Sequence, residues 1–106
     1  MDLIKGATYE FTAHGRWVDL FVPCDASGYP GLSYQNRLRP SLRVPNAPWF
    51  ALCGAVDRDL GRAFVIGDRL VHRADFAGRL YCFANDVPGW YWNNWGKVTV
   101  FVERVS

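Results

Sequence analysis

The sequence predicts an all-β protein that folds as an antiparallel β-sandwich. Several short stretches either alternate apolar and polar residues or are continuously apolar, and glycine, proline, asparagine or aspartate separates them. No stretch repeats apolar residues at helical spacing over a useful length. Short strands with turn residues between them are typical of sandwiches, so this is the fold class that we expect.

Length and charge restrict the possible classes of protein. The chain has 106 residues, 50% of them hydrophobic, which fits one domain over residues 1–106 with a real core. Its net charge of +2 is too small to predict a nucleic acid as partner. It has no apolar run long enough for a membrane span, and residues 1–6 lack the apolar region of a signal peptide. We therefore expect a soluble protein, cytoplasmic or released without a classical signal.

The first half of the chain contains three expected strands and a long loop. Residues 7–13 alternate apolar and polar residues between two glycines, and residues 17–22 form a second short strand that Pro23 ends. Residues 24–48 contain four prolines and few periodic apolar positions, so we expect a long surface loop there. Residues 49–56 are continuously apolar, which predicts a central strand covered on both faces.

The second half supplies the remaining strands, each bounded by glycine or aspartate. They are expected at residues 63–67, 69–72, 78–84 and 97–105. In the last strand, alternate valines form one face of the strand, and these are Val98, Val100 and Val102.

Side chains with metal or catalytic chemistry do not form a familiar pattern. Cys24, Cys53 and Cys82 are an odd number of cysteines, and we expect buried thiols. Neither His14 nor His72 lies at a zinc-site spacing from a cysteine. No Ser/His/Asp or Cys/His arrangement and no paired carboxylates can be defended, so we expect that the protein is not an enzyme.

The candidate site lies in the segment between the last two strands. This segment reads Asn85-Asp86-Val87-Pro88-Gly89-Trp90-Tyr91-Trp92-Asn93-Asn94-Trp95-Gly96. Proline and glycine favour a tight turn, which would bring Asp86 towards Asn93 and Asn94. One carboxylate, two carboxamides and unpaired main-chain carbonyls are the oxygen ligands that Ca²⁺ requires, although the spacing is not that of an EF-hand. The alternative is a turn without metal, because Asp and Asn are common turn residues.

Most of the chain resembles a known family. Residues 80–89, Tyr91, Asn93-Asn94, Gly96 and the strand Val98-Thr99-Val100 resemble the PA-IL-type family of bacterial calcium-dependent galactophilic lectins. Upstream similarity lies in Lys5-Gly6, residues 11–17, Cys53-Gly54-Ala55 and Ile66-Gly67. The resemblance implies a jelly-roll-like sandwich of the galactose-binding-domain-like type. It also implies that Ca²⁺ mediates binding of galactose or a related sugar.

The resemblance also implies roles for individual residues. The side chains of Asp86, Asn93 and Asn94 would bind Ca²⁺ together with the main-chain carbonyl of Trp90 and another carbonyl from residues 17–20. The ion would then coordinate two adjacent sugar hydroxyls. The implied sugar contacts are Asp86, Val87, Trp90, Asn93 and Asn94. We add Trp92 and Trp95 as candidate sugar contacts, because an indole face can stack on a sugar.

Three tryptophans distinguish this segment from the family pattern. Trp90, Trp92 and Trp95 stand where the family usually has small or polar residues. Their indoles either stack on the apolar face of a sugar or pack in the core or a protein interface. The second choice defines a different class of function, a non-enzymatic structural or protein-interaction module in which calcium only staples the loop.

The N-terminus also differs from the family pattern. The family has a further strand before the segment that here begins at Asp2, and residues 1–4 are too short to replace it. Residues 7–13 would then be an exposed edge with Glu10 as their only charge. Open edges are templates for strand pairing, so we expect a homo-oligomer.

Overall fold

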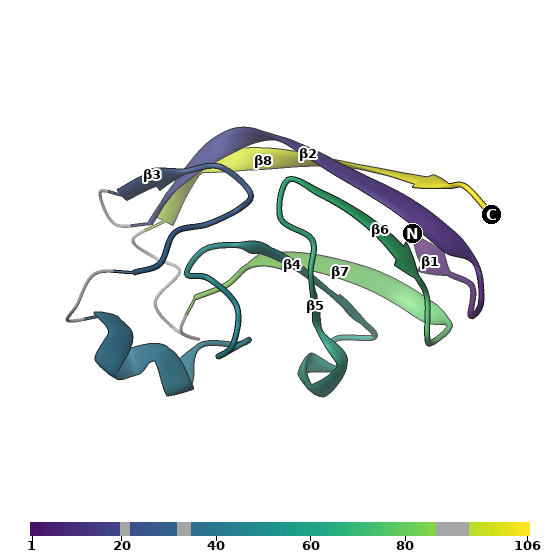
Figure 1. The fold of residues 1–106 in the computed structure, drawn as a ribbon, viewed down its shortest axis with the longest axis horizontal. Coiled ribbons are helices and arrows are strands. Elements are labelled where there is room, and N and C mark those ends of the chain that lie inside the picture. The colour runs from purple at the N-terminus through teal and green to yellow at the C-terminus, as the bar shows by residue number, and fades with distance from the viewer. Residues whose placement is uncertain (20–21, 32–34, 87–93) are drawn as a thin grey trace.

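Two antiparallel sheets face each other in a computed structural model that describes residues 1–19, 22–31, 35–86 and 94–106 (Figure 1). The first sheet has the order β1-β7-β4-β5. Its strands are β1 (Asp2–Leu3), β7 (Gly78–Ala84), β4 (Leu52–Val56) and β5 (Phe64–Val65). This arrangement confirms the prediction of an all-β sandwich.

The second sheet is built around its longest strand, β2 (Thr8–Asp19). Along one side of β2 lies β8 (Asn94–Arg104), and along the other side lie β6 (Arg69–Arg73) and β3 (Val22–Cys24). Two short 3₁₀ helices, η1 (Gln35–Ser41) and η2 (Leu60–Arg62), connect strands. Among the described residues there is no longer helix, in agreement with the sequence.

The core fills the space between the two sheets. Phe11 of β2 is fully buried and contacts Phe64 of β5 edge-on, with 5.8 Å between the ring centroids. Burying an aromatic or aliphatic side chain of this size stabilises the fold by about 1.5–3 kcal/mol. The predicted valine face of β8 is confirmed, because its members pack against this core, and they are Val98, Val100 and Val102.

The strand β2 is one continuous strand where the sequence predicts two, at residues 7–13 and 17–22. Gly15 was expected to end the first of them, but it lies inside β2 with a φ of +112°. A Cβ at this position would lie 2.7 Å from the carbonyl oxygen of Lys97, so the close approach of β8 requires glycine. Pro23 does not end a strand either, because it lies within β3, which pairs with β2 alone among the described strands.

The edges of the second sheet differ from the prediction. Residues 7–13 are not an open edge, because Phe11 pairs with Leu70 of β6 on one side and with Val102 of β8 on the other. The first residues also form a strand, since Asp2 of β1 pairs with Arg79 of β7. The long strand at the edge of this sheet is β8.

The middle of the chain is partly as expected. The strand β4 is central, between β5 and β7, as predicted, but it covers Leu52–Val56 rather than all of residues 49–56. The stretch 24–48 is more than a surface loop, because it contains η1 and several buried side chains, namely Ala26, Gln35, Leu42 and Ala47.

The three cysteines differ in exposure. Cys24 and Cys53 are buried as predicted, whereas Cys82 is exposed, so that part of the prediction is wrong. Burial raises the pKa of the Cys53 thiol from 9.0 to about 12, and the nearby Cys82 adds to the rise.

We expect the raised pKa of Cys53 to make stability fall in alkali. Between pH 9 and about 12 the unfolded thiol loses its proton while the folded one keeps it, so the free energy of unfolding decreases as pH rises. Urea denaturation at about pH 8 and about pH 10.5 measures this slope, and Cys53→Ala should make it shallower. An unchanged slope in the variant would contradict the assignment, whatever its effect on stability at neutral pH.

Candidate functional site

The candidate site lies at the end of the sandwich where β7 ends and β8 begins, on the left in Figure 1. Because β7 belongs to the first sheet and β8 to the second, the segment between them connects the two sheets. Asp86 follows β7 almost directly, and Asn94 is the first residue of β8. Two of the predicted calcium ligands therefore lie at the two ends of this connection.

Asp86 is buried at the end of β7, with 1% of its surface exposed. Its main-chain carbonyl accepts a hydrogen bond of 3.2 Å from the backbone N–H of Arg43. A carboxylate is costly to bury unless hydrogen bonds, an opposite charge or a metal ion stabilise it. A buried carboxylate at this point is consistent with the predicted role in binding a cation.

Asn85 positions the site, a role that the sequence did not suggest. Its side chain is fully buried, and its Oδ1 accepts a hydrogen bond of 2.9 Å from the N–H of Val44. Its Nδ2 donates to the carbonyls of Val44, at 2.9 Å, and Pro48, at 3.0 Å. These bonds fix residues 44–48 against the end of β7 and so determine where Asp86 lies. The available signal in the sequence was a carboxamide directly after a strand, in a chain with a proline-rich loop whose prolines lack a backbone N–H.

The end of β2 lies beside the start of β8. Asp19 pairs with Asn94 in the register of the two strands, and Trp17 pairs with Gly96. The resemblance implies a carbonyl ligand from residues 17–20, and the described part of this range, 17–19, is adjacent to the first residues of β8. Gly96 permits this closeness, because a Cβ there would lie 2.9 Å from the carbonyl oxygen of Arg16.

Trp17 closes the core beneath this end of the sandwich. Its ring packs edge-on against Phe50, with 5.1 Å between centroids. Its indole Nε1 is buried without a hydrogen-bond partner, which is uncommon for a buried donor. Among the described tryptophans, Trp17 packs against the core at this end, and Trp49 is buried.

Much of the predicted ligand set lies outside the described residues. This holds for Val87, Trp90, Trp92 and Asn93, and for the side chains of Asn94 and Trp95. Convergence on one ion and stacking on a sugar therefore stay predictions. Within the described ranges, no group of three or more His, Cys, Asp and Glu side chains could hold a metal ion. The predicted set is of another kind, with one carboxylate, carboxamides and main-chain carbonyls.

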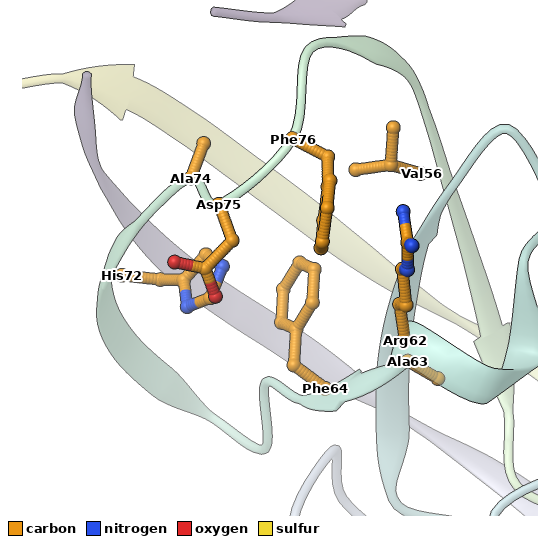
Figure 2. Close-up of a pocket in the computed structure, with 8 residues that line it drawn as sticks. All are labelled: Val56, Arg62, Ala63, Phe64, His72, Ala74, Asp75 and Phe76. Carbon is orange, nitrogen blue, oxygen red and sulfur yellow. The ribbon is translucent and has the colours of Figure 1, made fainter. Parts of the chain in front are cut away.

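A separate hollow of about 300 Å³ lies beside β5 and β6 (Figure 2). Within it, the rings of Phe64 and His72 stack with 4.2 Å between centroids. The guanidinium of Arg62 lies 3.8 Å from the ring centroid of Phe76 and pairs with Asp59 at 3.5 Å. No predicted site residue lines this hollow, and its cation already has an aromatic and an acidic neighbour.

Comparison with models of known protein families found no match, and comparison with curated proteins found none either. The resemblance to the PA-IL-type lectins therefore depends on the motif residues alone. In the described part of the chain, no helix is long and apolar enough to cross a membrane.

We expect Asn85→Ala to destabilise the protein by about 2–4 kcal/mol, because it removes every hydrogen bond of this buried side chain and deprives the Val44 N–H of its acceptor. Urea denaturation measures the change. Asn46→Ala, at an exposed position of the same segment, is the matched control and should change stability by less than about 0.5 kcal/mol. Equal losses in the two variants would contradict the role of Asn85.

Proposed function

We propose that the protein is a calcium-dependent carbohydrate-binding lectin rather than an enzyme. Its ligand would be galactose or a related sugar with a suitable pair of adjacent hydroxyls. The observation that carries the proposal is the buried carboxylate of Asp86, which belongs to the motif shared with the PA-IL-type lectins and follows β7 at the end of the sandwich.

The chain would hold the ion with oxygen atoms only. The side chains of Asp86, Asn93 and Asn94 would coordinate it, with main-chain carbonyls of Trp90 and of residues 17–20. Pairing of Asp19 with Asn94 supports this set, because it keeps the end of β2 beside the start of β8. Bound Ca²⁺ accepts six to eight oxygen ligands in flexible geometry, which leaves room for two sugar hydroxyls.

Asp86 would serve the ion and the sugar together. A carboxylate has two oxygens and several lone pairs, so one carboxylate can ligate a cation and accept a hydrogen bond from a hydroxyl. Because the set contains a single carboxylate, it should hold calcium less tightly than a buffer-type EF-hand. The hydrogen bonds of Asn85 would keep Asp86 in place for both tasks.

The tryptophans would supply apolar contact to the sugar. An indole face fits the C–H face of a pyranose, while its N–H stays accessible to water or hydroxyls. Trp92 and Trp95 are our candidates for stacking. We also propose that the protein is a homo-oligomer, since β8 offers a long edge for strand pairing.

The second candidate function is a structural or protein-interaction module in which calcium only staples the loop. The burial of Asn85 and Asp86 favours it, because two adjacent buried polar residues tied to the fold are what a stapled loop requires. In that case the tryptophans would contact protein rather than sugar.

Calcium should raise the melting temperature of the protein by mass action. At a concentration of about 100 Kd the stabilisation is about 2.7 kcal/mol. Asp86→Asn should abolish this gain, since it removes the only carboxylate of the set, and Asn93→Ala should reduce it. Differential scanning calorimetry in calcium and in EGTA measures the effect, with magnesium as a control. Superimposable curves of the wild-type protein in calcium and EGTA would exclude the site.

Galactose binding should require calcium. Titration calorimetry should show affinity in calcium and none in EGTA, and Trp92→Ala or Trp95→Ala should weaken it by about 1 kcal/mol or more. A monosaccharide without a suitable pair of hydroxyls is the control. A glycan array without any binding, together with calcium-dependent melting, would favour the staple instead.

A further inference from the structure

The strand β8 exposes a long edge. It pairs with β2 on one side, and none of the described residues pairs with its other side. Proteins usually protect such edges with proline, bulges, charged side chains, especially lysine, or a short strand. From Asn94 to Arg104 there is no proline, the charges stand only towards the two ends, at Lys97, Glu103 and Arg104, and Phe101 on the outer face is 58% exposed. The edge is thus competent to pair with another strand.

The hydrogen bonds of β2 determine which groups of β8 face this edge. The N–H of Val105 donates to the carbonyl of Thr8 at 2.9 Å, so this pair is a hydrogen-bonded one. Alternate residues of an antiparallel strand direct their backbone groups to opposite sides. Every second residue of β8, counted back from Val105, therefore forms backbone hydrogen bonds with β2. The backbone groups of the residues between them face the open edge, and these residues include Val98, Val100 and Val102.

The charges of β8 are unfavourably placed within one copy of the chain. Lys97 lies opposite Arg16, and Glu103 lies opposite Glu10. Like charges directly opposite each other destabilise a sheet. Glu10 forms an ion pair with Arg69, with 3.2 Å between the charged groups. Neither Lys97 nor Glu103 has an ion-pair partner among the described residues.

We propose that β8 pairs antiparallel with β8 of a second copy, around a two-fold axis at Val100. In this register Val100 faces Val100 of the partner subunit, and Val98 faces Val102 of the partner subunit. Lys97 then faces Glu103 of the partner subunit, and the symmetry makes this contact twice. Each of the two charges gains the opposite charge that β2 does not offer.

The hydrogen-bond phase and the charges select this register together. Residues whose backbone groups face the open edge can form hydrogen bonds only with residues of the second copy that do the same. The possible registers therefore differ by two residues. One step in either direction places Lys97 opposite Phe101 or Val105 and leaves Glu103 without a cation. The register centred at Val100 forms about six backbone hydrogen bonds between Val98 and Val102 of the two strands.

Apolar contact adds to the polar pairing. The valines of β8 that pack on the core are only partly buried. In the paired strands they meet their counterparts on the inner face, while Phe101 and Thr99 of opposite copies meet on the outer face. The interface involves neither calcium nor sugar, so it stands independently of the proposed function.

Charge reversal tests the register. Sedimentation equilibrium in EGTA should show a dimer of the wild-type protein, and Lys97→Glu or Glu103→Lys alone should weaken the dimer at least about tenfold. An equimolar mixture of the two variants should restore it, because one copy then carries glutamate at both positions and the other carries lysine at both. A wild-type monomer at about 100 μM would overturn the proposal. Undiminished association of either variant alone, or a mixture that stays monomeric, would do the same.

Folding of the variants provides an internal control. Each reversal replaces a like-charge pair within one copy by an opposite-charge pair, with Arg16 or Glu10. At protein concentrations at which the wild-type protein is monomeric, the melting temperature of the variants should therefore not fall. Amide hydrogen exchange adds a second measurement. Protection of Val98, Val100 and Val102 should rise with protein concentration, whereas Thr99 and Phe101, whose N–H groups bond to β2, should be protected throughout. Protection of the valines that is independent of concentration would overturn the proposal.

Discussion

The close pairing of β2 with β8 is the constraint on which the fold and the candidate site both depend. It is possible only because glycine occupies two positions where the backbones approach each other. A Cβ on Gly15 or Gly96 would lie 2.7 Å or 2.9 Å from a main-chain oxygen of the neighbouring strand. With these glycines the ladder continues from the core to Asp19 and Asn94. The long, regular pairing of β2 with β8 therefore determines the geometry at this end of the sandwich.

Two adjacent buried polar residues, Asn85 and Asp86, lie at that end. Asn85 is neutral, and the backbone of residues 44–48 satisfies its side chain, so its burial serves the fold. Asp86 has a carboxyl group, and burying a carboxylate requires stronger compensation than burying an amide. In the proposed site this separation of tasks has a physical advantage, because the residue that holds the loop would not also need to hold a ligand.

Local patterns of the sequence predicted the strands well where neighbouring residues determine them. The apolar run at residues 49–56 and the alternation in residues 97–105 each correspond to a strand. Predictions from local patterns were wrong where contacts with a distant segment determine the structure. Gly15 was interpreted as a break, although a strand some 80 residues later requires it there. The prediction of an open edge at residues 7–13 was wrong for the same reason, because no local pattern indicates which strands lie beside β2.

The candidate site shows the same division. Asp86 is a candidate ligand because of its motif, which is continuous in sequence, and the structure shows that it is buried. Asn85 lies in the same motif, yet its partners belong to a loop about 40 residues away, and no spacing within the motif indicates them. Cys82 was expected to be buried because its run is apolar, but alternation along β7 turns it outward.

The strand β8 connects the two proposals physically. Its first residue, Asn94, belongs to the proposed calcium site, and its length forms the proposed interface. Antiparallel pairing around Val100 reverses the direction of the second strand, so the two candidate sites would lie at opposite ends of a continuous sheet. Two sites on one rigid body can engage two sugars of a surface at once, which strengthens attachment without any change in either site. The interface would then matter most for ligands presented in many copies, where weak single-site affinity is sufficient.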